Sequence, residues 1–156
     1  MKIEIDQSGK IENTNRSTVV AFSNKIVGVL VITAKEKKSV QKYFRQIGKP
    51  KLFIYITFIA LIYYLIRKHI KDGDQMVIDR EYPGYEKLIT SSLKRWFKEK
   101  SNIDNITITT AQIGKKSRAH DLAWKEFQLK SHKLEEKISA EKLIKIIKAK
   151  LKSGSI

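Results

Sequence analysis

The sequence STVVAFSNKIVGVLVIT at residues 17–33 carries the clearest fold signal in the chain. β-branched and apolar residues fill positions 17–23 and 26–33, which predicts two strands. Asn24 and Lys25 can form the two-residue turn of a hairpin between them. Residues 2–6, KIEID, alternate apolar and charged side chains and predict another strand before the hairpin. We therefore expect this region to form an antiparallel meander of three strands.

Beyond the meander, the pattern changes to alternating helices and strands. Apolar residues at helical spacing predict a helix over residues 35–47, which Gly48 and Pro50 end. Strands joined through helices pair in parallel, and the helices cover the faces of the sheet. The fold class is thus α/β, a mixed five-stranded sheet flanked by helices. The later strands are expected at 75–79 and 105–113, and the later helices at 85–100, from about Arg118, and at 139–151.

Residues 52–66 form an apolar block without a charged side chain, and basic residues flank it on both sides. A helix of this length spans about 22 Å, short of the roughly 30 Å of a bilayer's hydrocarbon core. We expect a buried element of the protein core, with membrane contact as the alternative.

Composition limits the classes of protein and partner. A chain of 156 residues fits one domain; we expect it at residues 1–135, with a lysine-rich C-terminal helix and tail at 136–156 packed on it. The absence of cysteine excludes a disulfide scaffold, a cysteine zinc site and a thiol nucleophile, and it fits a cytoplasmic location. The net charge of +16 favours nucleic acid or an anionic membrane surface as the partner. We expect nucleic acid rather than a membrane, and a monomer or homodimer.

Acidic side chains stand where two predicted strands end, at Asp6 and Asp79. Strand ends in mixed α/β sheets line the usual active-site crevice, so these carboxylates would face each other if their strands are neighbours. Such a pair can hold two Mg²⁺ or Mn²⁺ ions, which stabilise the attacking and leaving oxygens in phosphodiester hydrolysis. His120 or Asp121, on a later helix, would complete the site as a ligand or proton shuttle. The candidate catalytic residues are Asp6, Asp79, Glu81, His120 and Asp121, and the candidate metal ligands are Asp6, Asp79, His120 and Asp121.

Each of these residues also has a purely structural interpretation. An aspartate after a strand commonly forms a turn or a cap. Asp121 lies in the first turn of a predicted helix, where the helix dipole favours a carboxylate. Glu81 can pair with Arg80 or a nearby lysine, and His120 can simply pack or form a hydrogen bond. Only the combination of these residues points to catalysis.

Cations suited to a phosphate backbone occur in two stretches of the chain. The loop at 114–118 offers backbone N–H groups, three cations and a hydroxyl where a helix begins, an arrangement that binds anions. Ser117 is the expected N-cap of that helix. Residues 35–51 form a basic helix face with aromatic residues; solvent-exposed lysines on ordinary surface elements are the alternative for both stretches. The candidate nucleic-acid-binding residues are Lys10, Lys35, Lys38, Lys42, Lys115, Lys116, Ser117 and Arg118.

The sequence DQSG at residues 6–9, the meander and the later strand ending in Asp79 resemble the ribonuclease H-like superfamily. This superfamily includes RNase H enzymes, RuvC-type junction resolvases, transposases and PIWI domains. The resemblance follows the order of elements from the N-terminus to about Leu129. It implies a mixed sheet with an acid on the first strand, another at the fourth strand, and a carboxylate or histidine on a late helix.

Residues of this chain match those places one by one. Asp6 and Asp79 match the two strand acids, and His120 or Asp121 matches the late-helix residue. The glutamate that RNase H itself carries on its first helix has Glu36 as its counterpart here, and Glu81 could replace it from the fourth strand.

Three functions are compatible with these features. The first is a metal-dependent nuclease that hydrolyses phosphodiester bonds in structured or hybrid nucleic acid by a two-metal mechanism. The second is a non-catalytic nucleic-acid-binding protein on the same scaffold, whose binding would weaken strongly with salt. The third is a membrane-associated protein that uses residues 52–66.

Overall fold

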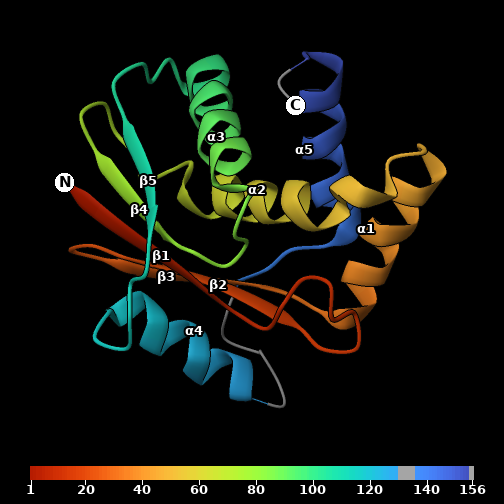
Figure 1. The fold of residues 1–156 in the computed structure, drawn as a ribbon, viewed down its shortest axis with the longest axis horizontal. Coiled ribbons are helices and arrows are strands. Elements are labelled where there is room, and N and C mark those ends of the chain that lie inside the picture. Colours follow the sequence, from red (N-terminus) through yellow and green to blue (C-terminus); the bar gives the residue numbers. More distant parts are fainter. Residues whose placement is uncertain (130–135, 155–156) are drawn as a thin grey trace.

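The computed structural model describes residues 1–129 and 136–154. Its centre is one mixed sheet with the strand order β5-β4-β1-β2-β3-β6 (Figure 1). The β1-β2-β3 meander is antiparallel, while β4, β5 and β6 pair in parallel with β1, β4 and β3. The α/β class and the antiparallel meander followed by parallel strands are confirmed. The strands are β1 (Lys2–Ser8), β2 (Thr18–Ser23), β3 (Val27–Ile32), β4 (Gln75–Asp79), β5 (Thr107–Ala111) and β6 (Glu136–Lys137).

The sheet has six strands rather than the predicted five. β6 is two residues long and pairs with Leu30 and Val31 of β3. Two residues are too few to show strand periodicity, so the sequence does not predict β6. Its pairing follows from the open edge of β3, which the folded sheet leaves available. β1 also continues to Ser8, past its predicted end, because the last three residues of β1 stay paired with β2. Asp6 therefore lies inside a strand and not at its end.

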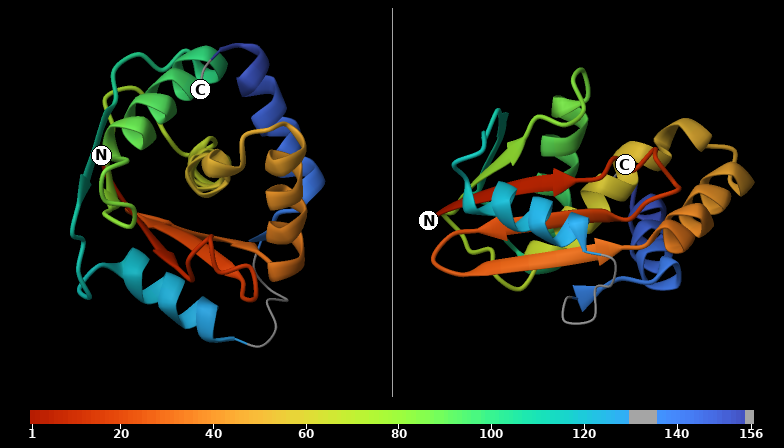
Figure 2. Two further views of the ribbon diagram at one scale, coloured as in Figure 1. Left: turned by 45° about the vertical axis from the view of Figure 1, so that its right-hand side comes forward. Right: turned by 90° about the horizontal axis from the view of Figure 1, so that it is seen from below.

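Helix α2 (Phe53–Ile66) contains the apolar block and lies at the centre of the main core. Twelve of its 14 residues are buried. Figure 2 (left) shows α2 end-on, with the sheet on one side and α1 (Ala34–Gln46), α3 (Glu86–Ser101) and α5 (Ala140–Lys152) around it. A helix that is apolar on every side needs such cover, because each side would otherwise expose apolar surface to water. The predicted buried element is confirmed.

A short 3₁₀ turn, η1 (Pro50–Leu52), joins α1 to α2. Among the residues that the structure describes, no helix combines the length and apolarity needed to cross a bilayer. The apolar surface of α2 is already covered by the protein itself.

Helix α4 (Arg118–Gln128) covers the opposite face of the sheet (Figures 1 and 2). There Ala123 packs with Val19, Ala21 and Val31 in a second, smaller apolar cluster. The molecule thus has three layers, with the sheet between α4 and the other described helices. α5 packs on α1 and α2, and β6 extends the sheet, so the described part of 136–156 belongs to the same body. The domain boundary predicted at residue 135 lies outside the described residues.

The turn after β1 brings α4 close to the sheet at Gly9. Gly9 has a φ of +78°, and a Cβ there would meet the Ser17 carbonyl oxygen and the Phe127 ring of α4. Gly73 has a φ of +89° with nothing within 4 Å of its Cβ position, so a side chain there would meet the same left-handed backbone strain without the close approach.

We expect Gly9→Ala to lower the free energy of unfolding by about 3 kcal/mol, through left-handed backbone strain plus overpacking. Gly73→Ala should cost about 1 kcal/mol from backbone strain alone. Urea unfolding of both variants measures the difference; equal losses would show that α4 does not approach Gly9 this closely.

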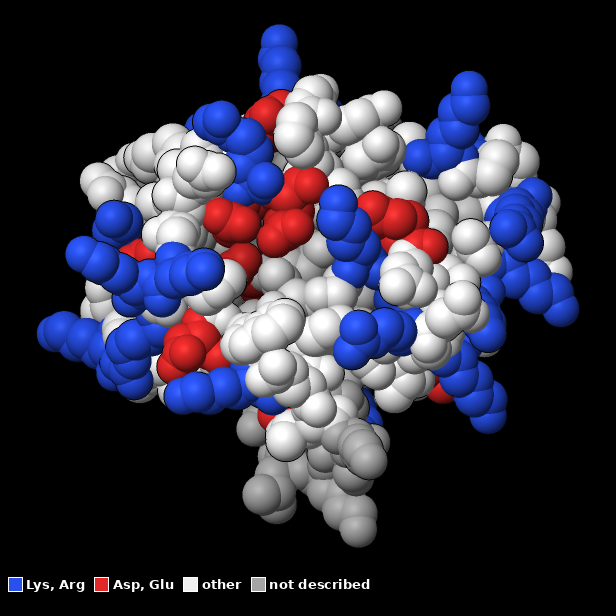
Figure 3. Space-filling model, turned by 60° about the horizontal axis from the view of Figure 1, so that its bottom comes forward, with Lys and Arg blue, Asp and Glu red and all other residues white. Residues whose placement is uncertain are grey.

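The face that α4 covers carries charges of both signs. Figure 3 shows Asp and Glu side chains gathered near the middle of this view, with Lys and Arg around its border. On a chain with a net charge of +16, such a local gathering of acids marks the region where the candidate residues are best sought.

Candidate active site

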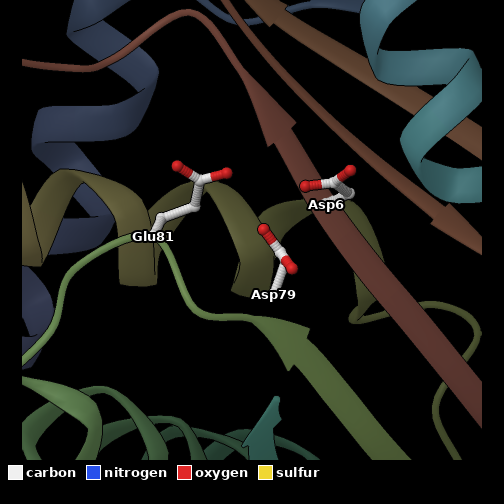
Figure 4. A group of neighbouring side chains, drawn as sticks. All are labelled: Asp6, Asp79 and Glu81. Atoms are coloured by element: carbon white, nitrogen blue, oxygen red, sulfur yellow. The ribbon is translucent and has the colours of Figure 1, made fainter. Parts of the chain in front are cut away.

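The pairing of β1 with β4 sets Asp6 beside Asp79. Ile5 pairs with Ile78 in parallel register, so the next residue on each strand is an aspartate. Side chains alternate between the faces of a sheet, and both isoleucines lie in the main core. Both aspartates therefore point to the opposite side, where α4 lies. Glu81 follows two residues after β4, and Figure 4 shows the three carboxylates gathered together.

Asp6, Asp79 and Glu81 form what we call the acidic cluster. One carboxylate oxygen from each lies within 4.8 Å of the others. Backbone N–H groups orient the aspartates: Gln7 donates to Asp6 Oδ1 at 2.7 Å, and Ile113 donates to Asp79 Oδ1 at 2.9 Å. Asp6 is only 2% exposed, whereas Asp79 and Glu81 are partly exposed. The cluster is thus anchored in the sheet and open on one side.

Burial and mutual repulsion disfavour the charged forms of this cluster. Burial raises the pKa of Glu81 to about 8, helped by the charges of Asp79 and Asp6 and opposed by Lys10. Burial also raises the pKa of Asp6, as does the charge of Asp79, while the Gln7 backbone and His120 act against it. A divalent cation would relieve this repulsion, and carboxylate oxygens are the ligands that Mg²⁺ prefers. The donor set therefore fits Mg²⁺ or Mn²⁺.

The two late-helix candidates lie in different surroundings. His120 reaches the acidic cluster, with Nδ1 2.6 Å from Asp6 Oδ2. Asp121 is exposed and pairs with Lys125 across one turn of α4 at 2.9 Å. The structure thus joins His120 to the cluster through Asp6, while the carboxylates that share one possible metal position are those of Asp6, Asp79 and Glu81. A direct metal bond from His120 or Asp121 stays a prediction.

The raised pKa of Glu81 predicts that the fold loses stability as pH rises. A bound metal ion should restore that stability. Between its ordinary pKa of 4.5 and about 8, the folded state holds a proton that the unfolded state has released. The free energy of unfolding should therefore fall as pH rises through this window. Millimolar Mn²⁺ should raise the melting temperature by several degrees, most strongly near pH 8, because metal binding displaces protons.

Thermal melts in chelator and in Mn²⁺, across that pH window, measure this effect. Glu81→Gln should flatten the pH dependence in chelator and reduce the response to Mn²⁺. Asp104→Asn is the matched control, because it removes an exposed carboxylate outside the acidic cluster, which pairs with Lys98 at 3.4 Å. An equal Mn²⁺ response in both variants would contradict binding at the acidic cluster.

The predicted basic residues divide between the two faces of the sheet. Lys10 lies near enough to Glu81 to affect its pKa. Lys115, Lys116 and Arg118 are exposed beside the beginning of α4. Ser117 is the N-cap, as predicted, and its Oγ accepts a hydrogen bond from the Ala119 backbone at 3.2 Å. The remaining candidates lie on α1, across the sheet from α4, and are exposed there: Lys35, Lys38 and Lys42.

Glu36, the first-helix counterpart in the ribonuclease H-like resemblance, has a different role. Its Oε2 accepts a hydrogen bond from the Ala140 backbone where α5 begins. Glu36 thus joins α1 to α5, and Glu81 is the glutamate that the acidic cluster contains.

Sequence reasoning missed the contact that positions Glu81. Buried Tyr82, the next residue, accepts a hydrogen bond from Gln7 Nε2 at 2.9 Å and another from the Ile11 backbone at 3.4 Å. These bonds tie the segment after β4 to the end of β1. Residue pairs 75 positions apart leave no local pattern, so only the polar Gln7 in a buried strand could have drawn attention to it.

Comparison of the chain with protein-family models, with curated proteins and with solved structures finds no match. Function is therefore inferred from the acidic cluster, its neighbours and the surrounding cations.

Proposed function

We propose that the protein is a metal-dependent nuclease with a ribonuclease H-like fold, which hydrolyses phosphodiester bonds in nucleic acid. The observation that carries this proposal is the convergence of Asp6, Asp79 and Glu81 within 4.8 Å, with His120 on Asp6. A mixed sheet with an acid on β1, an acid ending β4 and a histidine on a late helix is also what the superfamily resemblance implies.

Each residue has a distinct part in the proposed site. Asp6, Asp79 and Glu81 would hold the cations, and backbone N–H groups keep the aspartates oriented. With Nδ1 of His120 held by Asp6, Nε2 is the ring nitrogen that can take or give a proton. Bound Mg²⁺ or Mn²⁺ would supply the positive charge that stabilises the attacking and leaving oxygens of the phosphodiester.

Nucleic acid suits the charge that surrounds this site. The chain carries 32 Lys and Arg against 16 Asp and Glu. Lys10 and Lys115 are among the cations next to the acidic cluster and His120. A polyanion attracted by this excess would bring its phosphodiester bonds to the acidic cluster.

A cleavage assay with Mg²⁺, Mn²⁺ or chelator tests this function. The substrates are end-labelled single-stranded RNA and DNA, RNA–DNA hybrid, and a four-way junction. We expect cleavage of at least one substrate with Mg²⁺ or Mn²⁺ and none in chelator. Salt-sensitive binding without cleavage under any of these conditions would favour the non-catalytic nucleic-acid-binding protein.

A further inference from the structure

Trp124 is an unusual residue for an exposed position beside the candidate site. Its side chain is 48% exposed, although tryptophan is mostly buried in folded proteins. It lies four residues after His120, which places both on one side of α4, about 6 Å apart along the helix axis. His120 contacts Asp6 of the acidic cluster, so the indole stands one helical turn from the proposed chemistry.

A surface hollow of about 480 Å³ lies beside His120 and Trp124. It is lined by Lys115, His120, Asp121 and Trp124. Lys115 supplies a cation at its wall, and the carboxylate of Asp121 is paired with Lys125 at 2.9 Å. A ligand in this hollow would thus meet an aromatic surface, a cation and the histidine that reaches the acidic cluster.

Trp124 has an aromatic neighbour in Phe127, which is partly buried against the second apolar cluster. The Phe127 ring lies 6.2 Å from the Trp124 ring with an angle of 31° between their planes. The Arg16 guanidinium lies over the Phe127 ring, 4.1 Å from its centroid. Flat rings and a guanidinium next to lysines are the elements with which proteins hold single-stranded nucleic acid.

We propose that Trp124 stacks on an unpaired nucleobase and that the substrate is single-stranded next to the cleaved bond. This inference rests on the proposed nuclease function, which it deepens by naming the substrate class. Bases inside a duplex are stacked on their neighbours and cannot offer a face to the indole, whereas an unpaired base can. The cations of the loop before α4 would hold the flanking phosphates.

Intrinsic fluorescence provides a direct readout, because the chain has two tryptophans in contrasting positions. Trp96 is fully buried, so quenching by an added oligonucleotide reports on Trp124. The titrations use chelator to prevent cleavage, and three DNA probes of equal length: single-stranded oligothymidine, an abasic strand and a blunt duplex. The abasic strand has the same backbone charge as oligothymidine without its bases.

We expect oligothymidine to quench Trp124 and to bind at least about 10-fold more tightly than the abasic strand. Trp124→Ala should remove most of that preference, as measured by fluorescence anisotropy of labelled probes, and leave abasic binding unchanged. Trp124→Phe should keep most of it, because a flat ring remains. Unchanged emission from Trp96 in both variants confirms that the fold is intact.

Several outcomes would overturn the stacking site. The first is an equal loss of affinity for oligothymidine and for the abasic strand in Trp124→Ala. The second is tighter binding of the duplex than of oligothymidine, with no quenching of Trp124. The third is no binding of any probe. The readout needs no cleavage, so it separates the two proposals. Base-dependent binding through Trp124 without nuclease activity would refute the nuclease, and with it the statement about the cleaved bond, while the stacking site would stand. Cleavage without this dependence would refute the stacking site alone.

Discussion

Asp6→Asn is expected to abolish metal-dependent cleavage while leaving nucleic-acid binding intact. The substitution keeps the shape of the side chain and an oxygen that can accept the Gln7 backbone hydrogen bond. It removes the negative charge that would hold the cation and that fixes His120 at 2.6 Å. Loss of one group that acts on developing charge commonly costs about 10²–10³-fold in rate, so we expect a fall of at least about 100-fold.

Single-turnover cleavage and salt-dependent binding, measured on the same substrate, separate the two effects. Binding should be unchanged or slightly tighter, because a negative charge has been removed from a site that faces a polyanion. Asp79→Asn should give a similar loss of cleavage. Because Asp79 is more exposed than Asp6, this variant keeps the test valid if Asp6→Asn misfolds. Asp104→Asn should cleave normally. Full activity in Asp6→Asn would refute the proposed active site.

Lys37→Met is expected to destabilise the fold more than any surface substitution on α1. Lys37 is fully buried, and its Nζ donates to the Lys10 carbonyl at 3.1 Å, the Asn13 carbonyl at 2.6 Å and Thr18 Oγ1 at 3.0 Å. It thus joins α1 to the connection between β1 and β2. Removing the amino group takes one donor from all three acceptors, of which the two carbonyls keep a backbone N–H donor each, and this should cost about 3 kcal/mol.

Lys38→Met is the matched control, since Lys38 is the exposed neighbour on the same helix. Its unfolding free energy should stay within about 0.5 kcal/mol of the wild type. Urea unfolding measures both variants, and near-equal values for the two would contradict the structural role of Lys37.

The pH dependence gives a second check on Lys37. Burial lowers the pKa of Lys37 from 10.5 to about 8, with Glu12 acting against it. Between these values the unfolded state holds the proton that the folded state has released, so this residue should make the protein more stable as pH rises. The difference between wild type and Lys37→Met should therefore grow in that window. A constant difference would show that the buried amine keeps its ordinary pKa.

Local sequence patterns were sufficient where one element carries its own signal. The strand patterns at 2–6 and 17–33 predicted the meander, and the uncharged block at 52–66 predicted a buried element of the core, because periodicity and apolarity act within a few residues. Ser117 was identified as an N-cap for the same reason, since a cap acts on the N–H groups of its own helix.

The sequence predicted only some of the residues that form the candidate site. Asp79 ends β4, as its sequence position indicated. The end of β1 was missed because residues after Asp6 extend the strand only through their pairing with β2. The choice between His120 and Asp121 was open, since neighbours on a helix differ by rotation about the axis, and only docking of α4 decides which one meets Asp6.

The sequence by itself determined which residues are charged, which segments are apolar and the secondary structure of most segments, β6 and the end of β1 excepted. The tertiary structure alone decided that Asp6, Asp79 and Glu81 meet, because the β1–β4 register and the Tyr82–Gln7 contact join segments over 70 residues apart. Likewise, only the docking of α4 placed His120 on Asp6 and left Trp124 exposed beside it. Local propensity acts along the chain, whereas a site depends on contacts across it, and those are fixed by burying both faces of the sheet.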